Sequence, residues 1–366
     1  MSMKPNRNGH VALILEGREE ESLWRGAFES QGMPAEALPM SPDLERIATD
    51  GRMARARAVL VDAPLLAACR VSSSAFAAFL AERFPATRVF VRLPRRTGIS
   101  AAEQAWAHHA GIASLLPGST VAAWQESLAP VLARTLSAIE GPALDMPKLE
   151  SYLNGLMRSG AEPRPGFVKD AYVDAYQLES AGVNTARICE AMQDEIGVPV
   201  ADRAWRGRSY RDCFVASQAV DWLVARQGLR REVALRACTF LWRTGKLHHV
   251  LREADFQDDM LYFRFSGRRA ELERVDYVAL EAAMRSRGGL AIEERAYLSK
   301  SYPSCFVGGE AVDWIMARCG IPLGAAETIG QRMLELGIFH HVLDEHDFVE
   351  GKFFYRFRSD EAALLA

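Results

Sequence analysis

The 366 residues are enough for two or three domains, and 49% hydrophobic with 25% charged residues is typical of folded globular protein. The six cysteines are scattered without a C-x-x-C pair, which argues against a disulfide framework and against a structural zinc site. No signal-peptide pattern opens the chain, and no apolar stretch reaches the ~18 residues of a membrane span. We therefore expect a cytoplasmic protein without a metal or cofactor.

Residues 10–140 alternate short apolar runs with amphipathic stretches. The runs cover 11–15, 58–61, 88–93 and 112–116, with a further strand near 35–39. The amphipathic stretches cover 19–31, 74–84, 102–110 and 122–139. Alternating strands and helices predict right-handed βαβ units and a central parallel sheet, in a domain of flavodoxin-like size.

Two carboxylates end strands of this first domain. Glu16 follows the run 11–15, and Asp62 follows the run 58–61. With Gly111 and Leu115-Leu116-Pro117 near the last strand, this arrangement resembles the receiver domain of response regulators. The resemblance implies that Asp62 stands at the phosphoacceptor position and Glu16 at an acidic metal-binding position.

Three positions depart from the receiver pattern. The second acidic residue is replaced by Gly17 or Arg18, the hydroxyl after the fourth strand by Arg92 or Leu93, and the lysine before the proline by Leu116. Phosphoryl transfer to an aspartate needs Mg²⁺ held by several oxygens and a cation that neutralises the developing charge. We therefore interpret residues 1–140 as a degenerate, pseudo-receiver domain that docks or dimerises. The alternative is a response regulator phosphorylated at Asp62 with weaker metal help.

Residues 141–184 are rich in proline and glycine and are interpreted as a linker with one embedded helix. That helix, 148–158, has apolar residues on one face, namely Leu149, Tyr152, Leu153, Leu156 and Met157. We expect the face to pack on its own chain, and the alternative is a homodimer formed through this helix or through the first domain. Residues 170–195 also have a helical pattern.

The C-terminal half contains an internal repeat. A shift of 92 positions aligns 203–265 with 295–357 without a gap, and 25 of the 63 pairs are identical. Shared segments include Cys213-Phe214-Val215 with Cys305-Phe306-Val307, and Ala219-Val220-Asp221-Trp222 with Ala311-Val312-Asp313-Trp314. Repeats of this length indicate tandem globular domains and not a solenoid.

The pattern within each copy predicts helices followed by a hairpin. In the first copy, 218–226 and 231–244 have helical periodicity, with Ser217 as a candidate N-cap and Gly245 as the glycine after the second helix. Two strand-like runs follow at 247–251 and 261–265. The expected unit is a small α+β, winged-helix-like domain.

The order Tyr-x-x-Cys-Phe, Ala-Val-Asp-Trp, Gly-x-x-His-x-Val and the terminal Arg-Phe resembles the DEP domain, over about 185–267 and 277–359. The resemblance implies a non-enzymatic role. Members of this family bring signalling proteins to membranes, through anionic lipid headgroups or through protein partners.

The first copy carries the basic residues that an anionic partner needs. Residues 203–265 have a charge balance of +5, whereas 295–357 have −2. The family's membrane-facing feature is a basic loop between the first two helical segments, where the first copy has Arg206, Arg208 and Arg211 and the second has Leu298, Lys300 and Pro303. Arg230 and Arg231 add to this candidate site.

Other notable residues are interpreted as structural. Trp222 and Trp314 are predicted core residues, and Asp221 and Asp313 are expected to pair with Arg203 and Arg295. The dipeptides His248-His249 and His340-His341 suggest a metal site, but neighbouring residues of a strand point to opposite faces and one pair cannot chelate together.

These observations favour a non-catalytic signalling adaptor. Its tandem DEP domains would bind an anionic phospholipid surface or a protein partner, as a cytoplasmic protein peripheral to the inner membrane surface. A winged-helix DNA-binding regulator is an alternative, but the second helix of the first copy is apolar and the second copy is acidic. No common catalytic motif of the nucleotide-binding, zinc-protease or hydrolase type was found.

Overall fold

The structure is a computed structural model that describes residues 9–96, 98–119, 124–125, 127–158, 177–178, 181–205, 207–267, 272, 274–297 and 300–365. The chain divides into two compact units, one built mainly from residues 1–169 and the other mainly from residues 170–366. Among the described residues, no helix combines the length and apolar character needed to cross a lipid bilayer.

The first unit is built on a five-stranded parallel sheet of order β2-β1-β3-β4-β5. Its strands are β1 His10–Ile14, β2 Ala35–Ala37, β3 Ala56–Asp62, β4 Arg88–Leu93 and β5 Ser114–Pro117. The central strands are buried along almost their whole length, as expected of a parallel sheet covered on both faces. This is the flavodoxin-like order, so the predicted fold and all five predicted strands are confirmed.

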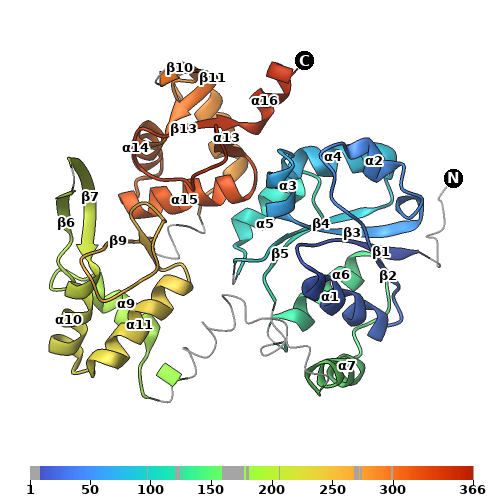
Figure 1. Cartoon of the computed structure of the whole chain (residues 1–366), viewed down its shortest axis with the longest axis horizontal. Coiled ribbons are helices and arrows are strands. Elements are labelled where there is room, and N and C mark those ends of the chain that lie inside the picture. The colour runs from blue at the N-terminus through green and yellow to red at the C-terminus, as the bar shows by residue number, and fades with distance from the viewer. Residues whose placement is uncertain are drawn as a thin grey trace. The chain divides into compact units, whose positions relative to one another are not determined.

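Helices cover both faces of this sheet (Figure 1). They are α1 Arg18–Ser30, α2 Leu44–Ala48, the 3₁₀ turn η1 Met53–Arg55, α3 Ala63–Ala68, α4 Ser73–Arg83, α5 Ala101–His109 and α6 Leu128–Ala138. The start of α5 is fixed by a capping box, in which Ser100 and Glu103 satisfy each other's backbone N–H groups. The predicted helix 122–139 begins only at Leu128, and residues 120–123 lie outside the described part of the chain.

The helix predicted in the linker is α7, Met146–Arg158, and it packs against α1 of its own chain. Leu149 and Leu153 are fully buried, and the Tyr152 hydroxyl donates a hydrogen bond to the carbonyl of Ser22 at 3.0 Å. Gly26 of α1 leaves room for the Tyr152 ring, because a Cβ at this position would lie 2.3 Å from ring carbons. The apolar face of α7 is therefore buried against its own chain.

The second unit contains the two repeats, which have the same element order. The first has α9 Thr185–Met192, β6 Ala201–Trp205, β7 Arg208–Val215, α10 Ala216–Gln227, α11 Arg231–Arg243, β8 Leu247–His249 and β9 Tyr262–Phe265. The second has α13 Tyr277–Arg285, β10 Glu293–Tyr297, β11 Lys300–Val307, α14 Gly308–Cys319, α15 Leu323–Glu335, β12 Phe339–His341 and β13 Phe354–Phe357, followed by α16 Arg358–Leu365. Their sheets have matching orders, β6-β7-β9-β8 and β10-β11-β13-β12. The predicted α+β fold is confirmed.

Each repeat also has an N-terminal hairpin that the sequence analysis missed. β6–β7 and β10–β11 form antiparallel arms between the first two helices of each repeat. We call β6–β7 the first arm and β10–β11 the second arm. Ser217 is not an N-cap, because α10 already begins at Ala216 and Val215 stands at the cap position. Gly245 does follow α11 with φ +71°, a left-handed conformation that favours glycine.

The backbone of each arm bends at the same place. Asp212 and Ser304 are matched residues, and both have positive φ angles, of 45° and 52°. The terminal strand of each repeat holds this bend, because Arg264 donates from Nε to the carbonyl of Arg211 and Arg356 donates to that of Pro303. The arginine of the shared Arg-Phe motif therefore anchors the base of the arm.

Replacing Gly26 by alanine is expected to lower the free energy of unfolding of the chain by about 1–3 kcal/mol, because Tyr152 must move away from α1. In a Tyr152→Ala background the same Gly26→Ala change should instead stabilise α1 by about 0.5–1 kcal/mol, the usual gain for alanine over glycine in a helix. Urea denaturation of the four proteins measures both values. Equal effects in the two backgrounds would show that α7 does not pack on α1.

Candidate functional site: the first arm and the contact between the repeats

Arg208 is one of the predicted basic residues that the structure shows exposed. It stands at the end of the first arm, where it is exposed and pairs in the ladder with Trp205. The Trp205 side chain is itself 56% exposed, although it is among the largest apolar groups of the chain. Arg206 falls between these two residues in the sequence and lies outside the described residues. The end of the arm thus combines an amphipathic aromatic ring with a cation.

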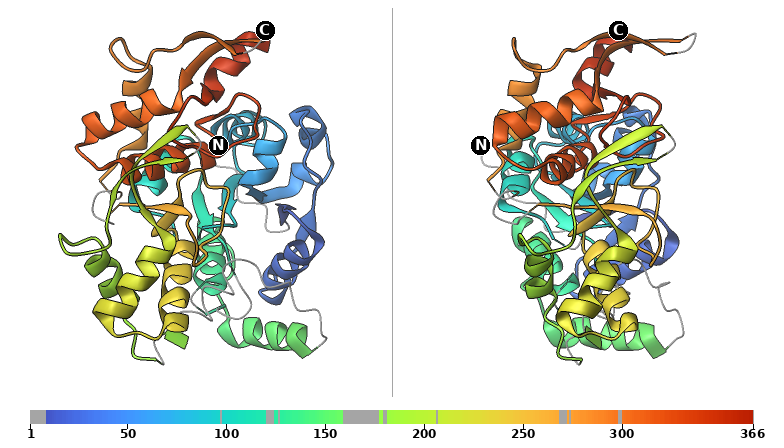
Figure 2. Two further views of the ribbon diagram at one scale, coloured as in Figure 1. Left: turned by 60° about the vertical axis from the view of Figure 1, so that its left-hand side comes forward. Right: turned by 90° about the vertical axis from the view of Figure 1, so that its left-hand side faces the viewer.

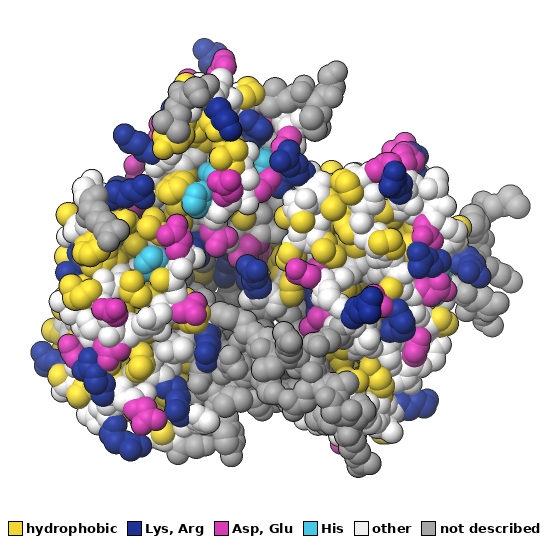
Figure 3. All heavy atoms as spheres, viewed as in Figure 1, with side chains coloured by type: hydrophobic (Ala, Val, Ile, Leu, Met, Phe, Trp, Pro, Cys, Tyr) yellow, Lys and Arg dark blue, Asp and Glu magenta, His cyan; other side chains and the backbone are white. Residues whose placement is uncertain are grey.

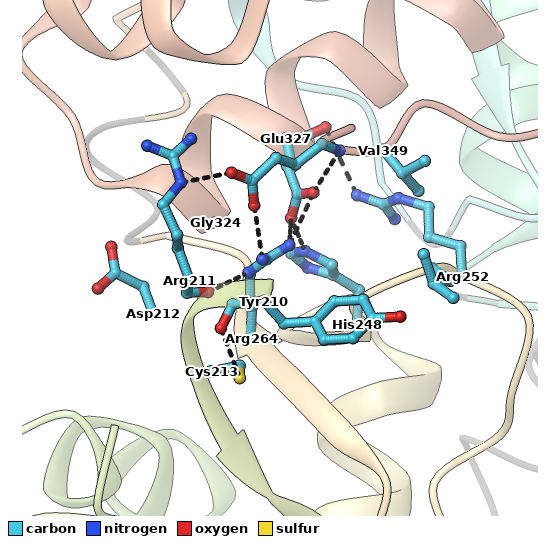
Figure 4. Close-up of polar contacts among 12 residues, drawn as sticks. Tyr210, Arg211, Asp212, Cys213, His248, Arg252, Arg264, Gly324, Glu327 and Val349 are labelled. Carbon is cyan, nitrogen blue, oxygen red and sulfur yellow. Dashed lines mark hydrogen bonds and ion pairs between the residues drawn. The ribbon is translucent and has the colours of Figure 1, made fainter. Parts of the chain in front are cut away.

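Arg211 lies at the base of the first arm and is already engaged with carboxylates of the second repeat. Its guanidinium donates to Asp313 Oδ1 at 2.7 Å and also to Glu350. Figure 4 shows the Arg211 side chain directed toward the second repeat. Any anionic ligand of Arg211 would have to compete with these two acidic side chains.

Arg230 and Arg231 lie at the start of α11, and Arg231 is held within its own repeat. Its guanidinium contacts Asp221 at 2.6 Å and Asp258 at 2.7 Å, while Arg230 is exposed at the N-cap position. The five predicted arginines are therefore not equivalent. Arg211 and Arg231 are neutralised by acidic partners, and Arg208 remains the exposed cation beside an exposed aromatic ring.

Trp222 packs against the core of the first repeat without being fully buried, and the two aspartates pair with other residues than those predicted. Trp222 and Trp314 are only partly buried, and Trp222 donates from Nε1 to the carbonyl of Ile196 at 3.1 Å. Asp221 and Asp313 are exposed and pair with Arg231 and Arg211. The core is occupied instead by fully buried aromatic rings of the β strands, namely Phe214 and Phe263 in the first repeat and Phe306, Phe339, Tyr355 and Phe357 in the second.

The expected partners of those aspartates have other contacts. Arg203 donates to Gln218 Oε1 at 3.1 Å, and Arg295 pairs with Glu310 at 3.0 Å. Both contacts join the first strand of an arm to the helix that follows it. The two arginines do have matched structural roles, but with residues one turn earlier in the helix than the sequence analysis assigned.

The neighbouring histidines of the first repeat point to different partners. His248 contacts Ser266 Oγ and Glu327 Oε2, each at 2.9 Å, whereas the His249 ring packs on Phe263. Glu327 belongs to the second repeat, so His248 takes part in a contact between the repeats. Burial, with Arg252 nearby, lowers the pKa of His248 to about 4 despite the hydrogen bond to Glu327, so the ring is neutral at pH 7.

Glu327 and Arg264 form a buried ion pair at the centre of this contact (Figure 4). Arg264 Nη1 lies 2.8 Å from both carboxylate oxygens of Glu327, and the side chains are 1% and 0% exposed. The backbone N–H of Glu350 donates to Glu327 Oε1 at 2.8 Å, and the Glu350 carboxylate accepts from Arg264 Nη2 at 2.7 Å. Although burial alone would raise it, Arg264 and His248 hold the pKa of Glu327 at about 2.

The helix that carries Glu327 approaches the first repeat closely. A Cβ on Gly324 of α15 would lie 2.0 Å from the carbonyl oxygen of Phe265 in β9. At the matched positions the first repeat has Glu232 for Gly324 and Leu235 for Glu327. The two helices have diverged at almost every position, with Ala234 and Ala326 as their one identical pair, so these two differences do not stand out in the sequence. They mark the residues of the second repeat that contact the first.

In the first unit, Asp62 is fully buried and both of its oxygens are occupied. Arg92 donates from Nε to Oδ1 at 2.6 Å and from Nη2 to Oδ2 at 2.9 Å, and the backbone N–H of Glu16 donates to Oδ2 at 2.8 Å. The Arg92 guanidinium also pairs with Glu20. The Glu16 side chain is exposed. Arg92, one of the two residues expected at the receiver's hydroxyl position, thus places a buried cation on Asp62.

Comparison with known proteins identifies the repeats. The model of the DEP family, described as the domain found in Dishevelled, Egl-10 and Pleckstrin, matches residues 197–265 and 289–357. The DEP domain of mouse pleckstrin is similar at 21% identity over 22% of the chain and 87% of that domain, with a TM-score of 0.21.

Curated relatives match over the same half of the chain but are much longer. A phosphatidylinositol 3,4,5-trisphosphate-dependent Rac exchanger 1 protein of Mus musculus is 27% identical over 225 residues, 58% of this chain and 13% of that protein. The vacuolar membrane-associated protein IML1 of Saccharomyces cerevisiae is 26% identical over 130 residues, 32% of this chain and 8% of that protein. The sequence thus spans only a small part of these relatives. Residues 197–265 and 289–357 are two tandem DEP domains, which follow a receiver-like domain built on a parallel sheet.

Proposed function

We propose that this protein is a non-catalytic signalling adaptor whose first DEP domain attaches it peripherally to an anionic membrane surface. The observation that carries the proposal is the end of the first arm, where exposed Arg208 stands beside the half-exposed ring of Trp205. Tryptophan favours the boundary between lipid and water, and a cation near an anionic surface contributes ~1 kcal/mol.

The charge distribution supports a local site over a broad basic face. On the face seen in Figure 3, basic, acidic and hydrophobic side chains are interspersed over the two repeats. Arg211 and Arg231 are paired with carboxylates, so they add little net charge to the surface. The names of two relatives, one dependent on a phosphoinositide and one vacuolar membrane-associated, are in keeping with a lipid surface as the partner.

The first unit then acts as a docking module that is not switched by phosphate. A phosphoacceptor aspartate needs room for Mg²⁺ and for the phosphoryl group, but Arg92 occupies both oxygens of Asp62. The buried guanidinium satisfies the carboxylate permanently, as a bound metal ion would do only transiently. The partner of the first unit would be another protein that binds to its surface.

DNA binding is the weaker alternative. The second helix of a winged-helix reader presents its outer face to the major groove. In α11, the apolar residues of that helix pack on the domain core, namely Val233, Leu235, Phe240, Leu241 and Trp242. In the second repeat, α15 is buried along most of its length and contacts the first repeat.

Replacing Arg206 and Arg208 together by alanine should weaken binding to vesicles that contain phosphatidylserine by roughly tenfold or more, since each cation contributes ~1 kcal/mol. The salt dependence of binding should fall with it. Vesicle flotation across a salt series measures both. Arg226→Ala, a change of an exposed arginine on α10, is the control and should have little effect. Wild-type protein that fails to float even at low salt would rule out the lipid partner and leave a protein partner.

Arg92→Gln is expected to lower the free energy of unfolding by about 3–5 kcal/mol, because it leaves the carboxylate of Asp62 buried without a counter-charge. Adding Asp62→Asn to that variant should recover much of the loss, as removal of both charges is better tolerated than removal of one. Denaturant unfolding provides the comparison. Treatment of the wild-type protein with Mg²⁺ and acetyl phosphate should leave its intact mass unchanged, and a phosphorylated species would contradict the docking role.

A further inference from the structure

The two arms end in the same way. In the first arm Trp205 pairs with Arg208, and in the second arm Tyr297 pairs with Lys300 at the matched positions. Both cations are exposed, and the Tyr297 side chain is 63% exposed. Each arm thus carries an amphipathic ring and a cation at its end, although neither pair contributes to a domain core.

Other parts of the arms are shared as well, namely Ser209-Tyr210 with Ser301-Tyr302 and Cys213-Phe214-Val215 with Cys305-Phe306-Val307. Further toward the base, Arg211 and Asp212 are matched by Pro303 and Ser304, so charge and size have diverged. Large aromatic side chains elsewhere in the repeats are mostly buried in the two cores. An exposed aromatic ring with a neighbouring cation therefore recurs at the end of both arms. Such a pair suits the boundary of a bilayer, where the ring enters the interface and the cation meets phosphate groups.

The contact between the repeats joins the base of the first arm to the second repeat. Arg264 joins the buried Glu327 of the second repeat to the carbonyl of Arg211, at the base of the first arm. Arg252 adds a hydrogen bond from Nε to the carbonyl of Phe348 at 3.1 Å. The right-hand view of Figure 2 shows the two arms extending toward the same side of the tandem repeats.

We propose that the two arms bind one anionic lipid bilayer at the same time, with Trp205 and Tyr297 in the interface and Arg208 and Lys300 on the headgroups. This inference rests on the proposed membrane attachment through the first arm. It adds that the second arm contacts the same bilayer. Once one arm is bound, the rigid connection holds the other near the surface, which raises its effective concentration.

The two contacts differ in kind. The second repeat has a charge balance of −2, and Glu293 and Glu294 belong to the second arm itself. Its contribution therefore comes mainly from the Tyr297 ring, whereas that of the first arm comes from both ring and charge. Salt should weaken the contact of the first arm more than that of the second.

The test measures partition of the full chain onto phosphatidylcholine vesicles with and without phosphatidylserine. Trp205→Ala and Tyr297→Ala should each weaken partition roughly tenfold, about 1.4 kcal/mol, and the double variant should bind no better than background. Met260→Ala, a change of another exposed apolar side chain, is the control and should leave partition unchanged.

A third variant separates the two repeats while both arm ends stay intact. Gly324→Glu introduces the residue that the first repeat has at this position, and its Cβ cannot coexist with the Phe265 carbonyl. It should weaken partition roughly tenfold while helical circular dichroism is retained. If that signal is lost, Glu327→Leu serves the same purpose with the matched residue Leu235.

The outcomes distinguish the two proposals. No partition of the wild-type chain onto anionic vesicles would overturn membrane attachment itself. Loss in Trp205→Ala but not in Tyr297→Ala would leave attachment through the first arm standing and overturn the second contact. Loss in both, with full partition in the folded Gly324→Glu variant, would overturn the requirement for a fixed arrangement of the arms.

Discussion

The organisation of the C-terminal unit depends on one buried carboxylate. Glu327 is removed from water, and this costs free energy unless strong hydrogen bonds replace the lost hydration. Here Arg264, His248 and a backbone N–H supply those bonds, and two of the three groups belong to the other repeat. The second DEP domain therefore carries a charge that only the first can satisfy, and separation of the two would expose an unpaired arginine and an unpaired glutamate.

This dependence affects how the basic residues of the first repeat should be viewed. A count of charges treats Arg208 and Arg211 alike, but the acidic groups of the second repeat select between them. Asp313 and Glu350 neutralise Arg211 at the base of the arm. Arg208 lies at the other end of the hairpin, away from these two carboxylates. The second repeat thus concentrates the accessible positive charge at the end of the arm.

Much of the fold was predictable because its signals are local or repeated. Apolar runs of strand length located all five strands of the parallel sheet, and the 92-residue repeat located both DEP domains. The arms were missed because their first strands, β6 and β10, are largely exposed and lack a buried alternating face. The contact between the repeats was missed for a different reason: Glu327 lies in a helix where an isolated glutamate normally faces water, and its partners in the first repeat, Arg264 and His248, are more than sixty residues away. Pairing of this kind depends on tertiary structure and leaves no periodic pattern.

The first repeat has Glu232 and Leu235 where the second has Gly324 and Glu327, and these differences fix the order of the two repeats. Two copies that arose by duplication are at first interchangeable, and recombination between them is harmless. The present copies differ at this contact, because the second has a glycine that admits the first and a buried carboxylate that the first neutralises, so they are no longer interchangeable. A chain with two first copies would have no buried acid for Arg264, because Leu235 stands at the position of Glu327. The tandem now behaves as a heterodimer whose subunits share one polypeptide.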